Sequence, residues 1–95
     1  MIVRIVKMTF RENEVLHFLE LFNSRKDMIR NFSGCSHLEL WNDAHQPNVY
    51  FTYSIWESEA KLDHYRFSEL FKDVWSKTKA LFAEKPEAWS LLKIK

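Results

Sequence analysis

The chain of 95 residues has a mass of 11.5 kDa, which leaves room for one domain, residues 1–95, built around a single core. Its 14 Lys and Arg and 13 Asp and Glu are interspersed and give a net charge of +1, so we expect no nucleic-acid-binding face. Its apolar runs are far shorter than the ~20 residues of a membrane helix, and no signal sequence is recognisable, so a cytoplasmic protein without membrane contact is expected.

The residue types that are unusually common or scarce limit which ligands and binding sites can be expected. Aromatic residues make up 16% of the chain, with 8 Phe, 4 Trp and 3 Tyr, and they favour cores, interfaces and pockets for flat ligands. Gly34 is the only glycine, which excludes a glycine-rich loop for nucleotide phosphates. Cys35 is the only cysteine, which excludes an internal disulfide and a multi-thiolate metal site, and we expect it to be a buried structural thiol.

The first third of the chain predicts a strand followed by a helix. Residues 2–10 alternate and are rich in β-branched side chains, as in a strand, and apolar residues fall on both faces. From about residue 13 to residue 31 the apolar period becomes that of a helix, and Gly34 follows as a left-handed cap. The expected inner stripe of this helix consists of Val15, Phe18, Leu19, Phe22, Met28, Ile29 and Phe32.

The rest of the chain predicts two strands joined by a polar turn, then two helices and a last strand. In chain order these are strands at residues 35–42 and 49–56, helices at residues 59–66 and 68–83, and a strand at residues 88–95. The strand that ends at Trp56 is apolar on both sides, which is typical of a strand buried on both sides. Ser58 is placed to cap the first of the two helices, and Pro86 follows the second.

The element order β-α-β-β-(αα)-β predicts an α+β fold. It corresponds to a ferredoxin-like sandwich, in which a four-stranded antiparallel sheet carries its helices on one face. The other face of the sheet would expose large apolar side chains on at least three strands, which monomers rarely do. A second copy of the chain is the simplest cover, so the pattern predicts a homodimer that pairs through this sheet face.

Two segments near the middle of the chain are similar to a known family. The sequence Tyr53-Ser54-Ile55-Trp56-Glu57-Ser58-Glu59-Ala60, followed by Ser68-Glu69-Leu70-Phe71, resembles the antibiotic biosynthesis monooxygenase family. The strand start Ile2-Val3-Arg4 and the helix end Phe32-Ser33-Gly34-Cys35 also fit, so the resemblance covers nearly the whole chain. It implies the dimeric α+β barrel, in which two such sheets pair.

The resemblance also implies oxygenation of a small aromatic phenol or quinol without a cofactor. In this chemistry the electron-rich substrate loses a proton, and its anion reduces dioxygen directly. The protein then has to supply a dry aromatic pocket, a hydrogen bond to the phenolate and a base. We therefore expect a monooxygenase with no cofactor and no metal site, and the four dispersed histidines agree with the absence of a metal-ligand spacing.

A related branch of the family cleaves haem, and this chain departs from its pattern. That branch carries an Asn on the first strand, a Trp nine residues beyond the tryptophan that matches Trp56, and a haem-ligating His ten residues later. Here the last two positions are Tyr65 and Trp75, and residues 2–10 contain no Asn. Haem degradation of that type is therefore not expected.

The candidate site residues follow from these comparisons of pattern and spacing. Trp56, Phe71 and Trp75 are expected to line a substrate pocket between the helices and the sheet. Tyr65 is the candidate that orients a phenolic substrate through its hydroxyl group. His37 is the candidate base, because the two-residue period of its strand places it on one face with a carboxylate, that of Glu39.

Plainer interpretations of the same residues stay open. Core packing alone also accounts for Trp56, Tyr65 and Trp75, and the face that carries His37 suits a dimer interface or solvent equally well. Arg4 suits either an anionic substrate group or a surface ion pair. Many relatives carry histidines where this chain has Tyr65 and Leu70, so the alternative function is a ligand-binding or structural dimer of the same fold without catalysis.

Overall fold

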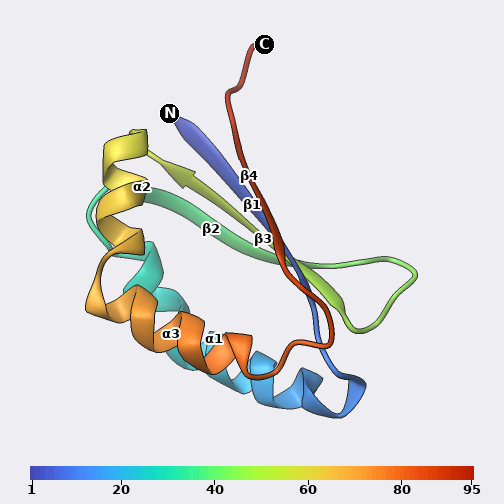
Figure 1. Cartoon of the computed structure of the whole chain (residues 1–95). Helices are drawn as coiled ribbons and strands as arrows, with labels where there is room; N and C mark the ends of the chain where they lie inside the picture. Colours follow the sequence, from blue (N-terminus) through green and yellow to red (C-terminus); the bar gives the residue numbers. More distant parts are fainter.

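The computed structural model describes residues 1–95, and its elements follow the predicted order (Figure 1). The strands are β1 (Ile2–Thr9), β2 (Cys35–Asn42), β3 (Val49–Trp56) and β4 (Glu87–Leu91). The helices are the short 3₁₀ helix η1 (Glu12–Glu14), then α1 (Val15–Arg30), α2 (Glu59–Arg66) and α3 (Glu69–Lys79).

The four strands form one antiparallel sheet in the order β2-β3-β1-β4. β1 and β2 run in the same direction with β3 between them, and α1 makes the crossover that such a pair requires. All the helices lie on one face of the sheet, and the other face is bare (Figure 1). The predicted ferredoxin-like α+β sandwich is therefore confirmed.

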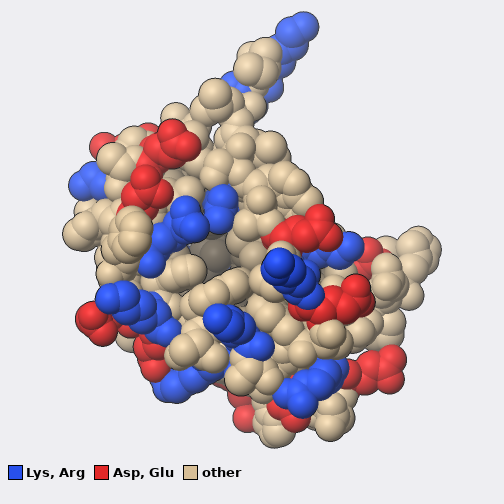
Figure 2. All heavy atoms as spheres, in the orientation of Figure 1, with Lys and Arg blue, Asp and Glu red and all other residues tan.

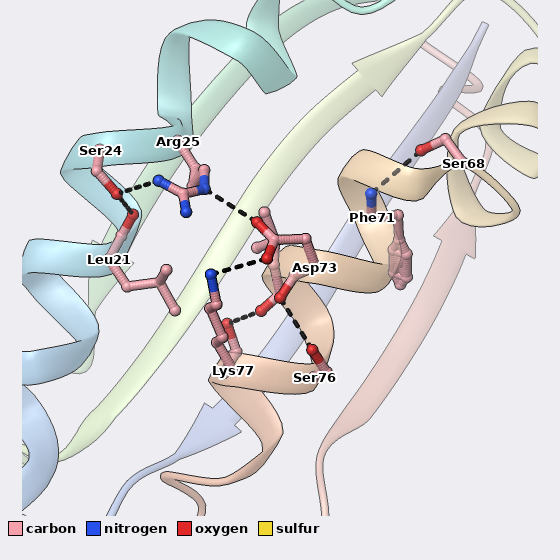
Figure 3. A network of polar contacts seen from close by, with 10 residues as sticks. Leu21, Ser24, Arg25, Ser68, Phe71, Asp73, Ser76 and Lys77 are labelled. Carbon is pink, nitrogen blue, oxygen red and sulfur yellow. Dashed lines mark hydrogen bonds and ion pairs between the residues drawn. The ribbon is translucent and has the colours of Figure 1, made fainter.

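Local signals in the sequence fix where the helices begin and end. The Ser58 hydroxyl accepts a hydrogen bond from the Lys61 amide at 3.2 Å and caps α2. The Ser68 hydroxyl accepts one from the Phe71 amide at 3.1 Å and caps α3 (Figure 3). Gly34, with a φ of 92°, turns the chain from α1 into β2 in the left-handed region that favours glycine. The predicted left-handed conformation of Gly34 is thus confirmed, but the residue that caps α1 is Asn31, three positions earlier.

The core lies between α1 and the sheet and is largely aromatic. Its centre is the pair Phe10 and Phe18, whose rings stack with centroids 4.1 Å apart. The buried cluster around them consists of Met8, Phe10, Phe18, Phe22, Ile29, Leu38 and Tyr50. A cavity adjoins this core and extends between the sheet and the α2–α3 pair, and five core residues also line it: Met8, Phe18, Phe22, Ile29 and Leu38.

One ion-pair network joins α1 to α3 and holds the helix layer together. Arg25 of α1 donates from Nε to Asp73 Oδ2 of α3 at 3.1 Å, and Lys77 Nζ lies 2.8 Å from Asp73 Oδ1 (Figure 3). The hydrogen bonds from Lys77 and Arg25 lower the pKa of Asp73 below its ordinary value of 3.8.

Two details of the first predicted helix are wrong. Its start is the 3₁₀ turn η1 rather than a full helical turn. Met28 was expected on the inner stripe but is 48% exposed, whereas Ile29 is buried. At about 100° per residue, Ile29 falls within about 20° of Phe22 on the helix face, but Met28 lies about 120° away from it.

Two predicted ends also differ from the observed ones. The helix expected at residues 68–83 stops at Lys79, because Phe82 pairs with Phe10 and the Leu81 carbonyl accepts from the Arg11 amide at 3.1 Å. The strand expected at residues 88–95 stops at Leu91, where its pairing with β1 ends opposite Val3. Beyond Leu91, β4 could pair only with the few residues of the chain that precede Val3.

The bare face of the sheet carries the apolar side chains that the alternation predicted. Register across the sheet places Tyr53, Ile5 and Trp89 in one row, and Trp89 is 41% exposed. Trp41, at 44% exposed, stacks on Tyr53 with ring centroids 4.8 Å apart. None of the helices is long and apolar enough to cross a membrane.

Candidate functional site

A cavity of about 310 Å³ lies between the sheet and the α2–α3 pair. Twenty residues line it, of which 13 are hydrophobic, and Figure 2 shows its opening as a hollow in the surface. β1 and β3 contribute the floor through the side chains that face the helices, including those of Val6, Thr52 and Ser54. The fold thus encloses a mostly apolar space large enough for a small ring system.

The four aromatic residues predicted for the site lie together on the lining of this cavity. Trp56 and Tyr65 stack with ring centroids 4.8 Å apart and an interplanar angle of 24°. Tyr65 and Phe71 lie 5.2 Å apart, and Phe71 and Trp75 lie 5.8 Å apart, again between centroids. One continuous wall of rings therefore runs from β3 across α2 to α3.

Trp56 is the fixed end of this wall. Its side chain is 1% exposed, and its indole Nε1 donates to the Ser54 hydroxyl at 3.0 Å. The Ser54 hydroxyl in turn donates to the Arg4 carbonyl at 3.5 Å, across the β1–β3 pairing. A side chain held in this way, with almost no accessible surface of its own, fixes the position of the Tyr65 ring that stacks on it.

Tyr65 is held as a neutral phenol. Burial raises its pKa well above the ordinary value of 10.0, and the nearby Cys35 contributes in the same direction. Its hydroxyl makes no hydrogen bond to another group of the protein, and its side chain lines the cavity. Tyr65 is therefore suited to donate a hydrogen bond to a ligand oxygen and unsuited to act as a base.

Cys35 is a free thiol beside this site rather than part of it. Burial raises its pKa, although a hydrogen bond with the His37 backbone acts in the opposite direction. Its Sγ lies 3.5 Å from the His37 carbonyl oxygen, to which the protonated thiol donates. A protonated, half-buried thiol is a poor nucleophile, so the expected structural role agrees with its surroundings.

His37 lies on the other face of the sheet, away from the cavity. It contacts the Glu39 carboxylate, which also accepts from Trp41 Nε1 at 2.8 Å, and its ring meets Tyr53 edge-on. The hydrogen bonds from His37 and Trp41 lower the pKa of Glu39 below its ordinary value of 4.5. The predicted His37–Glu39 contact is present, but the structure does not bring this candidate base to the predicted aromatic residues.

The charged side chains that line the cavity are two arginines and one carboxylate. Arg4 reaches it from β1, Arg66 from the end of α2, and Glu87 from the start of β4. Arg4 was a candidate from the sequence, whereas Arg66 and Glu87 were not. Arg66 carried one usable signal, because it stands four positions after the buried Leu62 and therefore shares its helix face.

No group of three or more His, Cys, Asp or Glu side chains in the chain is arranged to hold a metal ion. No histidine lines the cavity either, and position 75, where the haem-cleaving branch carries its axial ligand, holds the stacking ring of Trp75. The residues at this site thus do not fit an axially ligated haem.

Comparison with known proteins places the chain in a family. The family model for "Antibiotic biosynthesis monooxygenase" matches residues 1–76. The chain belongs to this family. No curated protein matches it.

Solved structures similar to this antibiotic biosynthesis monooxygenase family member share its fold over more than nine-tenths of their length. An antibiotic biosynthesis monooxygenase superposes with a TM-score of 0.93 at 17% identity, covering 100% of both chains. A conserved protein from Methanosarcina mazei Go1 gives 0.91 at 20% identity, covering 98% of this chain and 93% of that one. A protein from Mycobacterium tuberculosis gives 0.90 at 16% identity, covering 99% and 95%. Identities this low establish the shared fold.

Proposed function

We propose that the protein is a cofactor-independent monooxygenase that oxidises a small phenol or quinol with dioxygen inside this cavity. The observation that carries the proposal is the wall formed by Trp56, Tyr65, Phe71 and Trp75, in a chain that belongs to a monooxygenase family. The volume of about 310 Å³ falls at the lower end of the range of small-molecule sites, which suits a compact ring system.

The reaction takes its electrons from the substrate itself. A ring carbon bearing hydrogen, activated by the phenolate oxygen, becomes a carbonyl carbon: one atom of dioxygen is retained there, and the other leaves as water with two hydrogens of the substrate. The apolar lining excludes water from the reactive anion. No other reductant is needed.

The side chains on the lining have distinct roles in this proposal. The rings of Phe71 and Trp75 hold the substrate by stacking, and the buried Trp56 supports the wall from behind Tyr65. The neutral Tyr65 donates a hydrogen bond to the phenolate oxygen as negative charge develops. The substrate proton leaves to solvent through the cavity mouth, where Glu87 is the only carboxylate on the lining. His37 has no catalytic role, because it lies on the other face of the sheet.

The active form in this proposal is a homodimer that pairs through the bare sheet face. Trp41, Trp89 and Leu91 are 44%, 41% and 48% exposed there, and a second copy of the same face would cover them. The cavities lie on the helix side of each sheet and stay open to substrate.

A dimer of the same fold that binds a ligand without chemistry is the second candidate function. The observation in its favour is the lining of the cavity, which holds no histidine and only one carboxylate as a proton acceptor. Binding of an aromatic ligand without oxygen consumption would distinguish this function from a monooxygenase.

Oxygen consumption in the presence of anthrone and hydroquinone panels tests the proposed function. We expect uptake above buffer with at least one compound, and at least a tenfold loss in Tyr65→Phe and Trp75→Ala. Phe67→Ala is the matched control, because Phe67 is an aromatic residue 78% exposed and outside the cavity, and it should keep full activity. The absence of any uptake by the wild-type protein would contradict the proposal.

A further inference from the structure

Two guanidinium groups from different elements meet on the lining of the cavity. Arg4 projects from the helix-facing side of β1, and Arg66 is the last residue of α2. Figure 2 shows Lys and Arg side chains gathered at the rim of the hollow between α2 and β4. The rest of the lining is mostly apolar, so these cations are the strongest charges that a bound molecule would meet.

Neither cation is fully neutralised by the protein. Arg4 forms no ion pair; its Nη1 donates to the uncharged Ser90 hydroxyl at 2.9 Å. Arg66 has one carboxylate near it, that of Asp63 at 3.7 Å, and both of these side chains are about half exposed. Glu87, the only carboxylate on the lining, pairs with neither arginine. The lining itself therefore carries two guanidinium groups against one carboxylate, and Arg4 has no ion-pair partner.

The two arginines are close enough to affect one another. Burial lowers the pKa of Arg4, the positive charge of Arg66 lowers it further, and Asp63 acts in the opposite direction. Arginine nonetheless stays charged at any pH at which the protein is folded. A half-buried cation that faces another cation is stabilised when an anion lies between them.

The position of Arg4 connects this charge to the ring wall. Arg4 is paired in register with Ser54 of β3, and the Ser54 hydroxyl accepts the indole hydrogen bond of Trp56. The guanidinium therefore lies on the same lining as the stacked rings of Trp56 and Tyr65. An aromatic ring on that wall would place a substituent on its edge next to the arginines.

We propose that Arg4 and Arg66 bind a carboxylate carried by the ring of the substrate, so that the substrate class is an aromatic acid with a phenolic hydroxyl. The inference rests on the proposed function, since it assigns the substrate class of the same cavity. Guanidinium groups bind carboxylates through paired, charge-assisted hydrogen bonds, which the hydroxyl or ring of a neutral substrate cannot replace.

Binding of two probes that differ by one carboxylate tests this inference. At pH 7, 1-hydroxy-2-naphthoate is an anion and 1-naphthol is neutral, and the Kd of each is measured by quenching of tryptophan fluorescence and by calorimetry. We expect the wild-type protein to bind the acid at least tenfold more tightly. Arg4→Gln and Arg66→Gln should each reduce that ratio to below threefold without changing the Kd of 1-naphthol.

Lys72→Gln is the matched control for net charge. Lys72 is an exposed residue of α3 outside the cavity, so its removal should leave the tenfold preference intact. The exposed Arg66 keeps the test valid if Arg4→Gln does not fold, and added NaCl should weaken binding of the acid more than binding of the naphthol.

The outcomes separate this inference from the proposed function. Equal affinity of the wild-type protein for both probes, or a preference that survives both arginine substitutions, overturns the inference. Oxygen uptake with neutral quinols alone would uphold the proposed function and overturn the inference. A preference for the acid that both substitutions abolish, without any oxygen uptake, supports the inference and contradicts catalysis. Failure of both probes to bind overturns the inference.

Discussion

The role of Tyr65 depends on its surroundings more than on its residue type. A phenol in water ionises near pH 10 and can accept or donate a proton, but burial against Trp56 holds Tyr65 in the neutral form. A neutral phenol stabilises a phenolate by hydrogen bonding and cannot take up the proton that formed it. In a relative with histidine at this position the same place on the wall would hold a base, so the proposed reaction of this chain separates substrate binding from proton removal.

Gly34 gives a residue-scale prediction about stability. Its φ of 92° lies in the left-handed region, and a Cβ added there would lie 2.4 Å from the Cβ of Lys61 on α2. We expect Gly34→Ala to lower the free energy of unfolding by more than about 1 kcal/mol, since the backbone conformation alone costs about 1–2 kcal/mol. Urea denaturation followed by circular dichroism measures this change.

A second substitution at the same position separates the two causes. Asparagine tolerates the left-handed conformation better than alanine but carries the same Cβ, so Gly34→Asn retains the close approach to Lys61. Equal destabilisation by both variants would attribute the loss to this contact. An unfolding curve of Gly34→Ala that matches the wild type would contradict the prediction.

At the scale of elements, periodicity predicted what lies within each element but not where elements meet. The alternation of β3 and the spacing of Phe18 and Phe22 were sufficient to place strand and helix faces, because each side chain faces a single layer. The end of α3 was mispredicted because it depends on the pairing of Phe82 with Phe10, which is 72 residues earlier in the chain. Tertiary pairing of this kind leaves no local signal.

The candidate site shows the same division. Spacing along α2 and α3 placed Tyr65 and Trp75 together, and the family resemblance added Phe71; all three lie on one wall. His37 was assigned to the site on the strength of its neighbour Glu39, but strand alternation alone does not tell which face of the sheet the helices cover. The other strands of the sheet determine which of its faces the helices cover, so the sequence of β2 alone does not predict on which side His37 lies.

The ion-pair network between α1 and α3 gives a prediction about pH. Because the pKa of Asp73 is lowered in the folded protein, its contribution to stability is present above its ordinary pKa of 3.8 and is lost as the pH falls through the lower folded value. We expect Asp73→Asn to have a lower Tm than the wild type at pH 7, with the difference shrinking below pH 3.8. Calorimetric scans across this range measure it.

Glu69→Gln on the same helix is the control for this prediction. Glu69 is 93% exposed and pairs only with Lys72, within α3, at 3.5 Å. Its removal should change Tm little at any pH, because exposed pairs contribute little. A Tm difference for Asp73→Asn that persists unchanged in acid would show that packing, rather than the charge on Asp73, links the two helices.

At the scale of the whole molecule, the chain exposes more surface than its mass requires. Its accessible area is 6256 Å², whereas a folded monomer of this mass has about 5,800 Å². Part of the excess is the bare sheet face, and part is the segment after β4, where Leu92 and Ile94 are 67% and 84% exposed and the chain extends away from the fold (Figure 1). A surface of this kind is typical of one half of an assembly.

The proposed homodimer gives the prediction for the whole molecule. Sedimentation equilibrium at micromolar concentration should report a mass of about 23 kDa, twice the 11.5 kDa of one chain.

Ile5 lies on the central strand β1 in one row with Tyr53 and Trp89, so Ile5→Glu places a charge in the middle of the shared face and should yield a monomer. Trp89→Glu, on the exposed edge strand, tests the same face with less effect on folding. Leu16→Glu is the matched control, because Leu16 is 73% exposed on α1 in the helix layer, and it should remain dimeric. A wild-type protein of 11.5 kDa, or an assembly that Leu16→Glu disrupts and Ile5→Glu does not, would show that the two sheets do not pair.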